Sequence, residues 1–115
     1  TDMESFTWNR IVAAMADALG CQARVVHVPS ETLIRYNSDW SGPLLGDKTW
    51  SVMFDNTKVM SVAGEFECKV SLEAGMKGAA EDYFRRRADA YQPDEKLHAL
   101  LDRICAEQES VGAGA

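Results

Sequence analysis

Few side chains in this chain have the type and spacing to do chemistry. It contains two histidines, His27 and His98. His27 lies among valines, where a histidine with a structural role is the simpler interpretation, and a hydrolase or isomerase that uses it with residues 37–48 is the alternative. His98 borders the apolar stripe of the last predicted helix. Neither has the neighbours of a zinc motif, so we expect no metal site.

The cysteines and carboxylates point to no active site either. Cys21, Cys68 and Cys105 share no close spacing. An odd number of cysteines without a CxxC or Cys/His pattern indicates reduced thiols and a cytoplasmic protein. Carboxylate pairs such as Glu65 and Glu67 are typical of solvated faces, and the sequence holds no P-loop or GxSxG motif. The residues alone therefore argue against an autonomous enzyme.

Composition limits the class of protein and its partners. The 115 residues are 46% hydrophobic and 26% charged, which is typical of one globular domain. A net charge of −6 disfavours nucleic acid and anionic membranes as partners, because both need clustered Lys and Arg. The only basic run, residues 85–87, falls where a helix should end and where cations complement the helix dipole. No apolar run approaches the roughly 20 residues that cross a bilayer.

Hydrophobic periodicity predicts an α+β fold, a small and mostly helical domain with two or three short strands. Strands are expected at 24–28 and 50–54, and residues 65–70 should be extended. Each predicted helix carries an apolar stripe that should be buried. The helices are expected at 8–19, 30–36, 57–63, 71–86 and 94–108.

Caps and glycines mark where these helices begin and end. Thr7 and Ser71 are suitable N-caps, and Gly20 and Gly64 should stop the helices before them. Gly75 and Gly78 lie inside a predicted helix, where the simplest explanation is close backbone packing against a neighbour. Residues 37–48 form the longest irregular segment, and a loop of this length in a compact domain is more often functional than idle.

One stretch resembles a known family. The segment Asp55-Asn56-Thr57-Lys58, a glycine at Gly64, the segment 70–75 (VSLEAG) and Tyr83 resemble the C-terminal region of extended short-chain dehydrogenases/reductases, the NAD-dependent epimerase/dehydratase family. That family has a D-x-[ST]-K segment, a glycine that ends a short helix, and S-L-x-x-G at the start of the next helix. Upstream, Gly46-Asp47 is similar to its R-P-G-D turn. The resemblance extends over residues 6–84.

The resemblance implies a substrate-binding lobe without its catalytic half. Residues 6–108 would form a single domain, with flexible ends at 1–5 and 109–115. The family's Rossmann domain binds NAD(P) and supplies a glycine-rich turn and a Tyr-x-x-x-Lys motif, neither of which occurs here. We therefore expect no cofactor in this chain, with NAD(P) only in the missing Rossmann half. The chain starts at Thr1 without an initiator Met, which we interpret as either a trimmed or tagged chain or the tail end of a longer protein, so that it is open whether it is a fragment or a complete gene product.

The resemblance also names candidate substrate-binding residues, namely Leu44, Asp47, Lys48 and Lys58. Leu44 stands where the family has an arginine. Without that arginine, the guanidinium N–H donors that would bind a diphosphate are missing. Lys48 offers only a point charge. The substrate would then be a sugar or a nucleotide-sugar, with the family's usual diphosphate contacts weakened. The alternatives are that Asp47 is a turn former and that Lys58 makes a surface ion pair.

Two functions follow from different classes of protein. The first is the substrate-binding C-terminal part of an NAD-dependent epimerase/dehydratase-like oxidoreductase, inactive by itself and paired with a Rossmann-domain partner. The alternative is a stand-alone binding or homodimeric interaction module derived from that lobe. A lobe without its partner exposes apolar surface, which is usually covered. In a homodimer that surface would be buried through the Trp8 helix or through the helix of Met76 and Tyr83.

Overall fold

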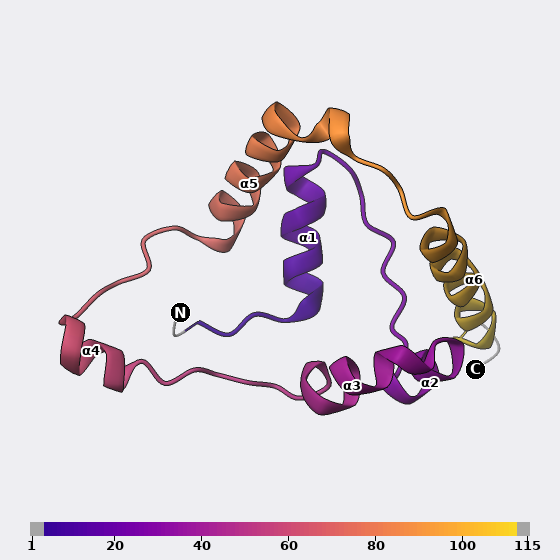
Figure 1. Cartoon of the computed structure of the whole chain (residues 1–115), viewed down its shortest axis with the longest axis horizontal. Coiled ribbons are helices and arrows are strands. Elements are labelled where there is room, and N and C mark those ends of the chain that lie inside the picture. Colours follow the sequence, from indigo (N-terminus) through magenta and orange to yellow (C-terminus); the bar gives the residue numbers. More distant parts are fainter. Residues whose placement is uncertain (1–3, 113–115) are drawn as a thin grey trace. The chain divides into compact units, whose positions relative to one another are not determined.

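The computed structural model describes residues 4–112, and each regular element in this range is helical (Figure 1). Two 3₁₀ turns, η1 (Ser38–Trp40) and η3 (Ala88–Ala90), and a π-helical turn, η2 (Leu44–Lys48), accompany the α-helices. The α-helices are α1 (Trp8–Ala18), α2 (Ser30–Tyr36), α3 (Ser41–Pro43), α4 (Thr57–Ala63), α5 (Leu72–Arg86) and α6 (Glu95–Gly112).

These elements form two compact units. The first combines the chain up to Arg24 with Val52–Tyr91, and therefore contains α1, α4 and α5. The second combines Val25–Ser51 with the chain from Gln92, and contains α2, α3 and α6. The expectation of a single domain over 6–108 stays a prediction.

The predicted α+β fold is wrong, because residues 4–112 are all-α and contain no strand. Residues 24–28, 51–54 and 65–69 are irregular where strands or extended chain were expected. Their β-branched and alternating residues favour extended backbone, but a strand forms only when a second strand accepts and donates its hydrogen bonds. No segment within residues 4–112 supplies that ladder. Val25, in the predicted 24–28 strand, is exposed.

The helix starts that depend on local chemistry are confirmed. The Thr7 hydroxyl accepts a hydrogen bond from the Arg10 N–H at 3.2 Å, and the Ser71 hydroxyl accepts one from the Ala74 N–H at 3.1 Å. Each satisfies a backbone N–H that has no partner inside its helix. The 37–48 segment is less irregular than expected, since η1, α3 and η2 follow one another through it. The last helix, α6, continues to Gly112 and so ends later than the predicted 108.

Two of the glycines also behave as predicted. Gly64 ends α4 with φ 84° and ψ 170°, a conformation that is essentially limited to glycine, and Gly20 follows α1 with φ 67°. The expectation of close packing at Gly75 and Gly78 is wrong. A Cβ atom at Gly78 would meet nothing within 4 Å, and one at Gly75 would make only an ordinary contact of 3.7 Å with Val70 Cγ1.

The core of each unit is small. In the first unit α1 and α5 lie side by side (Figure 1), and the buried apolar side chains are those of Ala14 and Ala16. In the second unit Ile104 is only 2% exposed. The apolar stripes that the sequence predicts do exist on the helices, yet much of each stripe is uncovered. Trp8, for example, is 65% exposed and Phe84 is 57% exposed.

Candidate functional site

Three of the predicted substrate-binding residues lie on the π-helical turn η2. Leu44 is its first residue and is half-buried, whereas Asp47 and Lys48 are exposed. The Lys48 ammonium pairs with the neighbouring Asp47 carboxylate. An anionic substrate would have to compete with that carboxylate for the only cation on the turn, and Leu44 adds no hydrogen-bond donor from its side chain. The turn is therefore a poor site for a diphosphate.

The η2 turn is held by hydrogen bonds at its C-terminal end. The Thr49 N–H donates to the Leu44 carbonyl at 2.9 Å, and the Trp50 indole N–H donates to the Leu45 carbonyl at 3.0 Å. The Ser30 and Thr49 hydroxyls lie 2.6 Å apart and connect the turn to the start of α2. Ser30 is the first residue of α2, and its hydroxyl is used in this contact. π-Helical turns are frequent at functional sites, so η2 remains the best candidate among the predicted positions.

Lys58 does not lie with the other three residues. It is exposed on α4 in the first unit, whereas η2 belongs to the second. The Lys58 carbonyl accepts a hydrogen bond from the Ser61 hydroxyl at 2.8 Å, an ordinary interaction within a helix. The four predicted residues therefore form no single site within either unit.

The D-x-[ST]-K segment has a structural explanation in this chain. Asp55 Oδ1 accepts hydrogen bonds from the Thr57 hydroxyl at 2.6 Å and from the Thr57 N–H at 2.9 Å. These bonds, with the hydroxyl contributing most, lower the pKa of Asp55 below its ordinary value. The aspartate and the threonine together fix the start of α4, which explains the residue types without a ligand.

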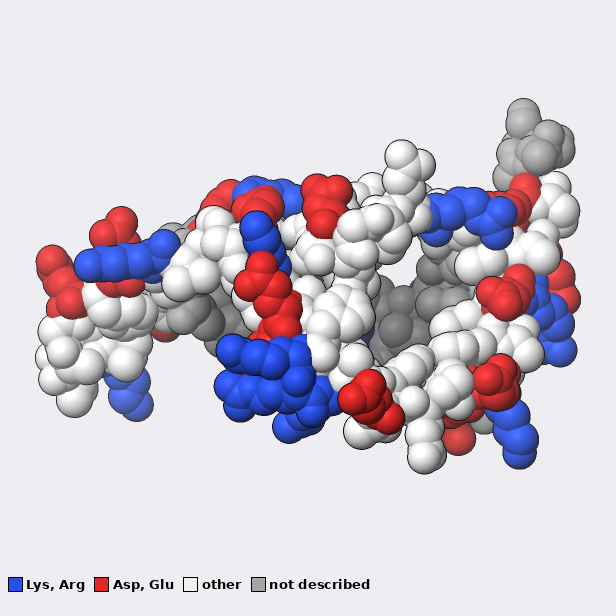
Figure 2. All heavy atoms as spheres, turned by 90° about the horizontal axis from the view of Figure 1, so that it is seen from above, with Lys and Arg blue, Asp and Glu red and all other residues white. Residues whose placement is uncertain are grey.

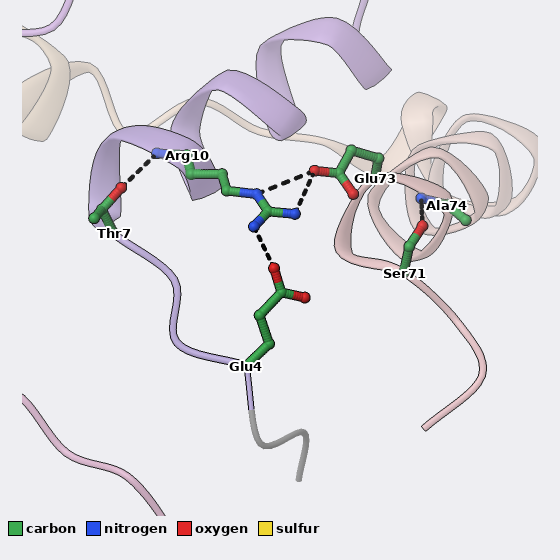
Figure 3. Close-up of polar contacts among 6 residues, drawn as sticks. All are labelled: Glu4, Thr7, Arg10, Ser71, Glu73 and Ala74. Carbon is green, nitrogen blue, oxygen red and sulfur yellow. Dashed lines mark hydrogen bonds and ion pairs between the residues drawn. The ribbon is translucent and has the colours of Figure 1, made fainter. Parts of the chain in front are cut away.

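A charged cluster joins the first turns of α1 and α5 (Figure 3). Arg10 Nη1 lies 2.5 Å from Glu4 Oε1, and Arg10 Nη2 lies 3.1 Å from Glu73 Oε1. Arg10 Nε also donates to the same Glu73 oxygen, at 3.3 Å. One guanidinium thus connects the residues before α1 with the beginning of α5.

The ion pair shifts the pKa values of Arg10 and Glu73 so that the charged form of each is favoured. The hydrogen bonds that the guanidinium donates to Glu4, and next those to Glu73, raise the pKa of Arg10. The pKa of Glu73 is lowered, first by its own backbone N–H and then by Arg10. Periodicity could not reveal this cluster, because residues 10 and 73 are far apart in the sequence. The available signal was that each lies within three residues of a predicted N-cap, Thr7 or Ser71.

In the second unit an aromatic side chain joins α2 to α6. The Tyr36 hydroxyl donates to Glu107 Oε2 at 2.5 Å and accepts from Gln108 Nε2 at 3.2 Å. The Arg103 guanidinium lies over the Tyr36 ring, 5.6 Å from its centre. The hydrogen bond to Glu107 is the main cause that raises the pKa of Tyr36. These contacts hold α2 and α6 together.

The segment between α4 and α5 is the most exposed stretch with a regular pattern. All residues from 65 to 70 are exposed, and Glu65, Phe66, Glu67 and Lys69 line an open surface hollow. Within the described part of the chain, the backbone of 65–70 makes no hydrogen bond to other backbone groups. This segment is a predicted extended element whose backbone pairing groups are unused within residues 4–112.

Residues 4–112 contain neither a metal-binding cluster nor a membrane-spanning helix. Among residues 4–112 no group of three or more His, Cys, Asp and Glu side chains is arranged to hold a metal ion. Cys21, Cys68 and Cys105 are free thiols, and His27 lies exposed in an irregular segment rather than inside a strand. In the same range, no helix combines the length and apolar character needed to cross a bilayer.

Charge is mixed over the visible surface. Figure 2 shows acidic and basic side chains interspersed on the face that it displays, together with one larger cluster of basic side chains. Comparison of this chain with protein-family models, curated proteins and solved structures finds no match.

Proposed function

We propose that this chain is a helical interaction module that functions as a homodimer, in which a second copy covers apolar surface that the single chain leaves exposed. The observation that carries the proposal is the exposure of the predicted stripes. Helix α1 presents Trp8 and Met15 to solvent, and α5 presents Phe84. Large exposed aromatic and Met side chains are typical of protein interfaces.

A second group of exposed apolar residues supports the same function. Val52, Met53 and Phe54 follow one another before α4, and each is at least 60% exposed. Burial of apolar surface contributes about 25 cal/mol per Å², so covering these side chains gives a substantial driving force for association. An apolar run of this kind in water favours a covered state over a solvated one.

The proposal is tested by sedimentation velocity from low to high micromolar protein. We expect a concentration-dependent dimer whose population falls in Trp8→Ala and Phe84→Ala. Ala13→Ser, at an exposed position on α1, is the matched control and should leave association unchanged. A monomer at every concentration would contradict the proposed function.

The second candidate is the substrate-binding C-terminal part of an NAD-dependent epimerase/dehydratase-like oxidoreductase. The observation that favours it is the order of elements around the resemblance: Asp55 at the start of α4, Gly64 at its end, and Ser71 as the cap of α5. In this case a Rossmann-domain partner would hold NAD(P), and η2 would face a sugar or nucleotide-sugar. With its three free thiols, the protein would work in the cytoplasm under either candidate.

A binding experiment separates the two candidates. A uridine diphosphate sugar is titrated calorimetrically into this chain, alone and mixed with any Rossmann-domain protein encoded beside it. The oxidoreductase candidate predicts binding that appears with the partner and weakens in Lys48→Ala, with Lys96→Ala as an exposed control. Tight binding of NAD by this chain alone would contradict it, because the cofactor half would then be unnecessary.

A further inference from the structure

Residues 65–70 alternate strictly between polar and apolar side chains. Glu65, Glu67 and Lys69 fall on one side of an extended chain, and Phe66, Cys68 and Val70 fall on the other. Such a period of two is typical of a strand with one buried face. Phe66 is 41% exposed and Val70 is 68% exposed, so the apolar side is not covered within the single chain.

The ends of this segment isolate it from the helices on both sides. Gly64, with its φ of 84°, stops α4, and the Ser71 hydroxyl caps α5. Between them the chain runs as an extended trace (Figure 1). The N–H and C=O groups of 65–70 bond to no other backbone group within residues 4–112, and Glu67 and Lys69 form no ion pair there. The segment has what an edge strand needs for pairing with another chain.

The sequence of this segment is complementary to itself when it pairs antiparallel about its centre. If Cys68 lies opposite Cys68 of a second copy, Phe66 lies opposite Val70 and Glu67 lies opposite Lys69. The two-fold axis repeats each pair, as an isologous interface requires. Apolar side chains then meet on one face and opposite charges meet on the other, and both kinds of cross-strand pair are stabilising.

Neighbouring registers lack this complementarity. A shift that preserves the two faces brings either Glu67 opposite Glu67 or Lys69 opposite Lys69, which places like charges together at the centre. A shift by one residue instead places the apolar side chains of one copy opposite the charged side chains of the other. The register centred on Cys68 is therefore selected by the residues themselves.

We propose that residues 65–70 of two copies pair as antiparallel strands centred on Cys68. This pairing rests on the proposed homodimer and assigns to it one interface element and one register. Two short strands alone form a marginal structure, so the apolar helix faces near them contribute further burial to the dimer.

Disulfide trapping tests the contact at the centre. In a chain with Cys21→Ser and Cys105→Ser, only Cys68 can react. Diamide oxidises two Cys68 thiols to a disulfide with release of their protons, and takes up the two electrons and the protons as it becomes the hydrazine. We expect rapid formation of a crosslinked dimer, measured by intact mass. The matched control keeps Cys21 and Cys105 and carries Cys68→Ser, and it should crosslink slowly.

Charge exchange tests the register. Glu67→Lys places lysines opposite each other twice and should weaken the dimer roughly fivefold, because each like-charged pair across strands is destabilising. The same substitution makes this acidic chain less negative, so a nonspecific charge effect would strengthen association instead. Lys69→Glu should also weaken the dimer, and the double variant Glu67→Lys/Lys69→Glu should restore it, because its pairs are again opposite in charge.

A mixing experiment gives the sharpest outcome. Copies with Glu67→Lys and copies with Lys69→Glu should prefer each other, since only the mixed dimer has opposite charges at both positions. Helical circular dichroism checks that each variant keeps its helices. A dimer that ignores all of these substitutions overturns the pairing but leaves the proposed homodimer intact, whereas a monomer at every concentration removes both.

Discussion

Helix α5 and the segment 65–70 before it are adjacent in sequence and differ in how their pattern is satisfied. Both are amphipathic, one with a period near 3.6 and the other with a period of two. The helix bonds its own backbone and needs only the Ser71 cap to begin. The extended segment cannot bond its own backbone, and within the described chain nothing else does so. The chain therefore satisfies the backbone of α5 internally, whereas the backbone groups of 65–70 are open to a partner.

The largest expected effect concerns the packing of helix α1. Ala14 is buried in α1, and Ala14→Asp would force a larger carboxylate out of water and into that site. We expect a loss of about 3 kcal/mol in the free energy of unfolding, measured by urea denaturation. Ala13→Asp is the matched control, because Ala13 is exposed on the same helix, and it should change stability little. Equal effects at both positions would show that α1 is not packed in this orientation.

The glycine that separates α4 from the extended segment should give the next effect. Gly64→Ala puts a Cβ on a residue with φ 84° and ψ 170°, and should destabilise the chain by about 1–3 kcal/mol. Gly78→Ala, inside α5 with open space around it, should instead stabilise by roughly 0.5–1 kcal/mol. Thermal unfolding by circular dichroism measures both. Two changes of the same sign would contradict the assignment of Gly64 as the stop.

Removal of the α5 cap should have a smaller effect. Ser71→Ala leaves the Ala74 N–H without its acceptor and should cost about 1 kcal/mol, whereas Ser71→Asp should keep the helix start. Helicity and the midpoint of urea unfolding measure the change. If Ser71→Ala and Ser71→Asp unfold alike, the hydroxyl does not cap α5.

The smallest effect concerns the Arg10–Glu73 pair. The folded pKa of Glu73 is lowered, so the stabilisation by the pair is fully present above the unfolded pKa of about 4.3 and is lost as the pH falls through the lower folded value. Glu73→Gln should lower the midpoint of thermal unfolding at pH 7 by about 2 °C or less, since the pair is exposed. The difference between the two proteins should shrink as the pH is lowered below that unfolded value. The lowered pKa of Asp55 acts in both proteins and cancels in this difference.

Local features of the fold could be predicted from the sequence, and nonlocal ones could not. Thr7, Ser71 and Gly64 act through neighbours a few residues away, and the helix ends they define are confirmed. The strands at 24–28 and 50–54 were wrong, because composition favours an extended chain but cannot supply the second strand.

The candidate site was harder to predict than the helices. Lys58 was grouped with Leu44, Asp47 and Lys48 by resemblance, yet it lies on α4 in the other unit. Resemblance over short motifs carries the order of residues along the chain and not their distances in space. The contacts between distant residues, such as the Arg10–Glu73 pair, needed the structure.

Hydrogen exchange of the backbone amides at different protein concentrations tests the central claim most directly. The interior amides of α5 should be protected at every concentration, because their hydrogen bonds lie within one helix. Within 65–70, alternate amides should gain protection as the concentration rises, since antiparallel pairing bonds every second residue to the partner strand. Fast exchange throughout 65–70 at all concentrations, while α5 stays protected, would contradict the account.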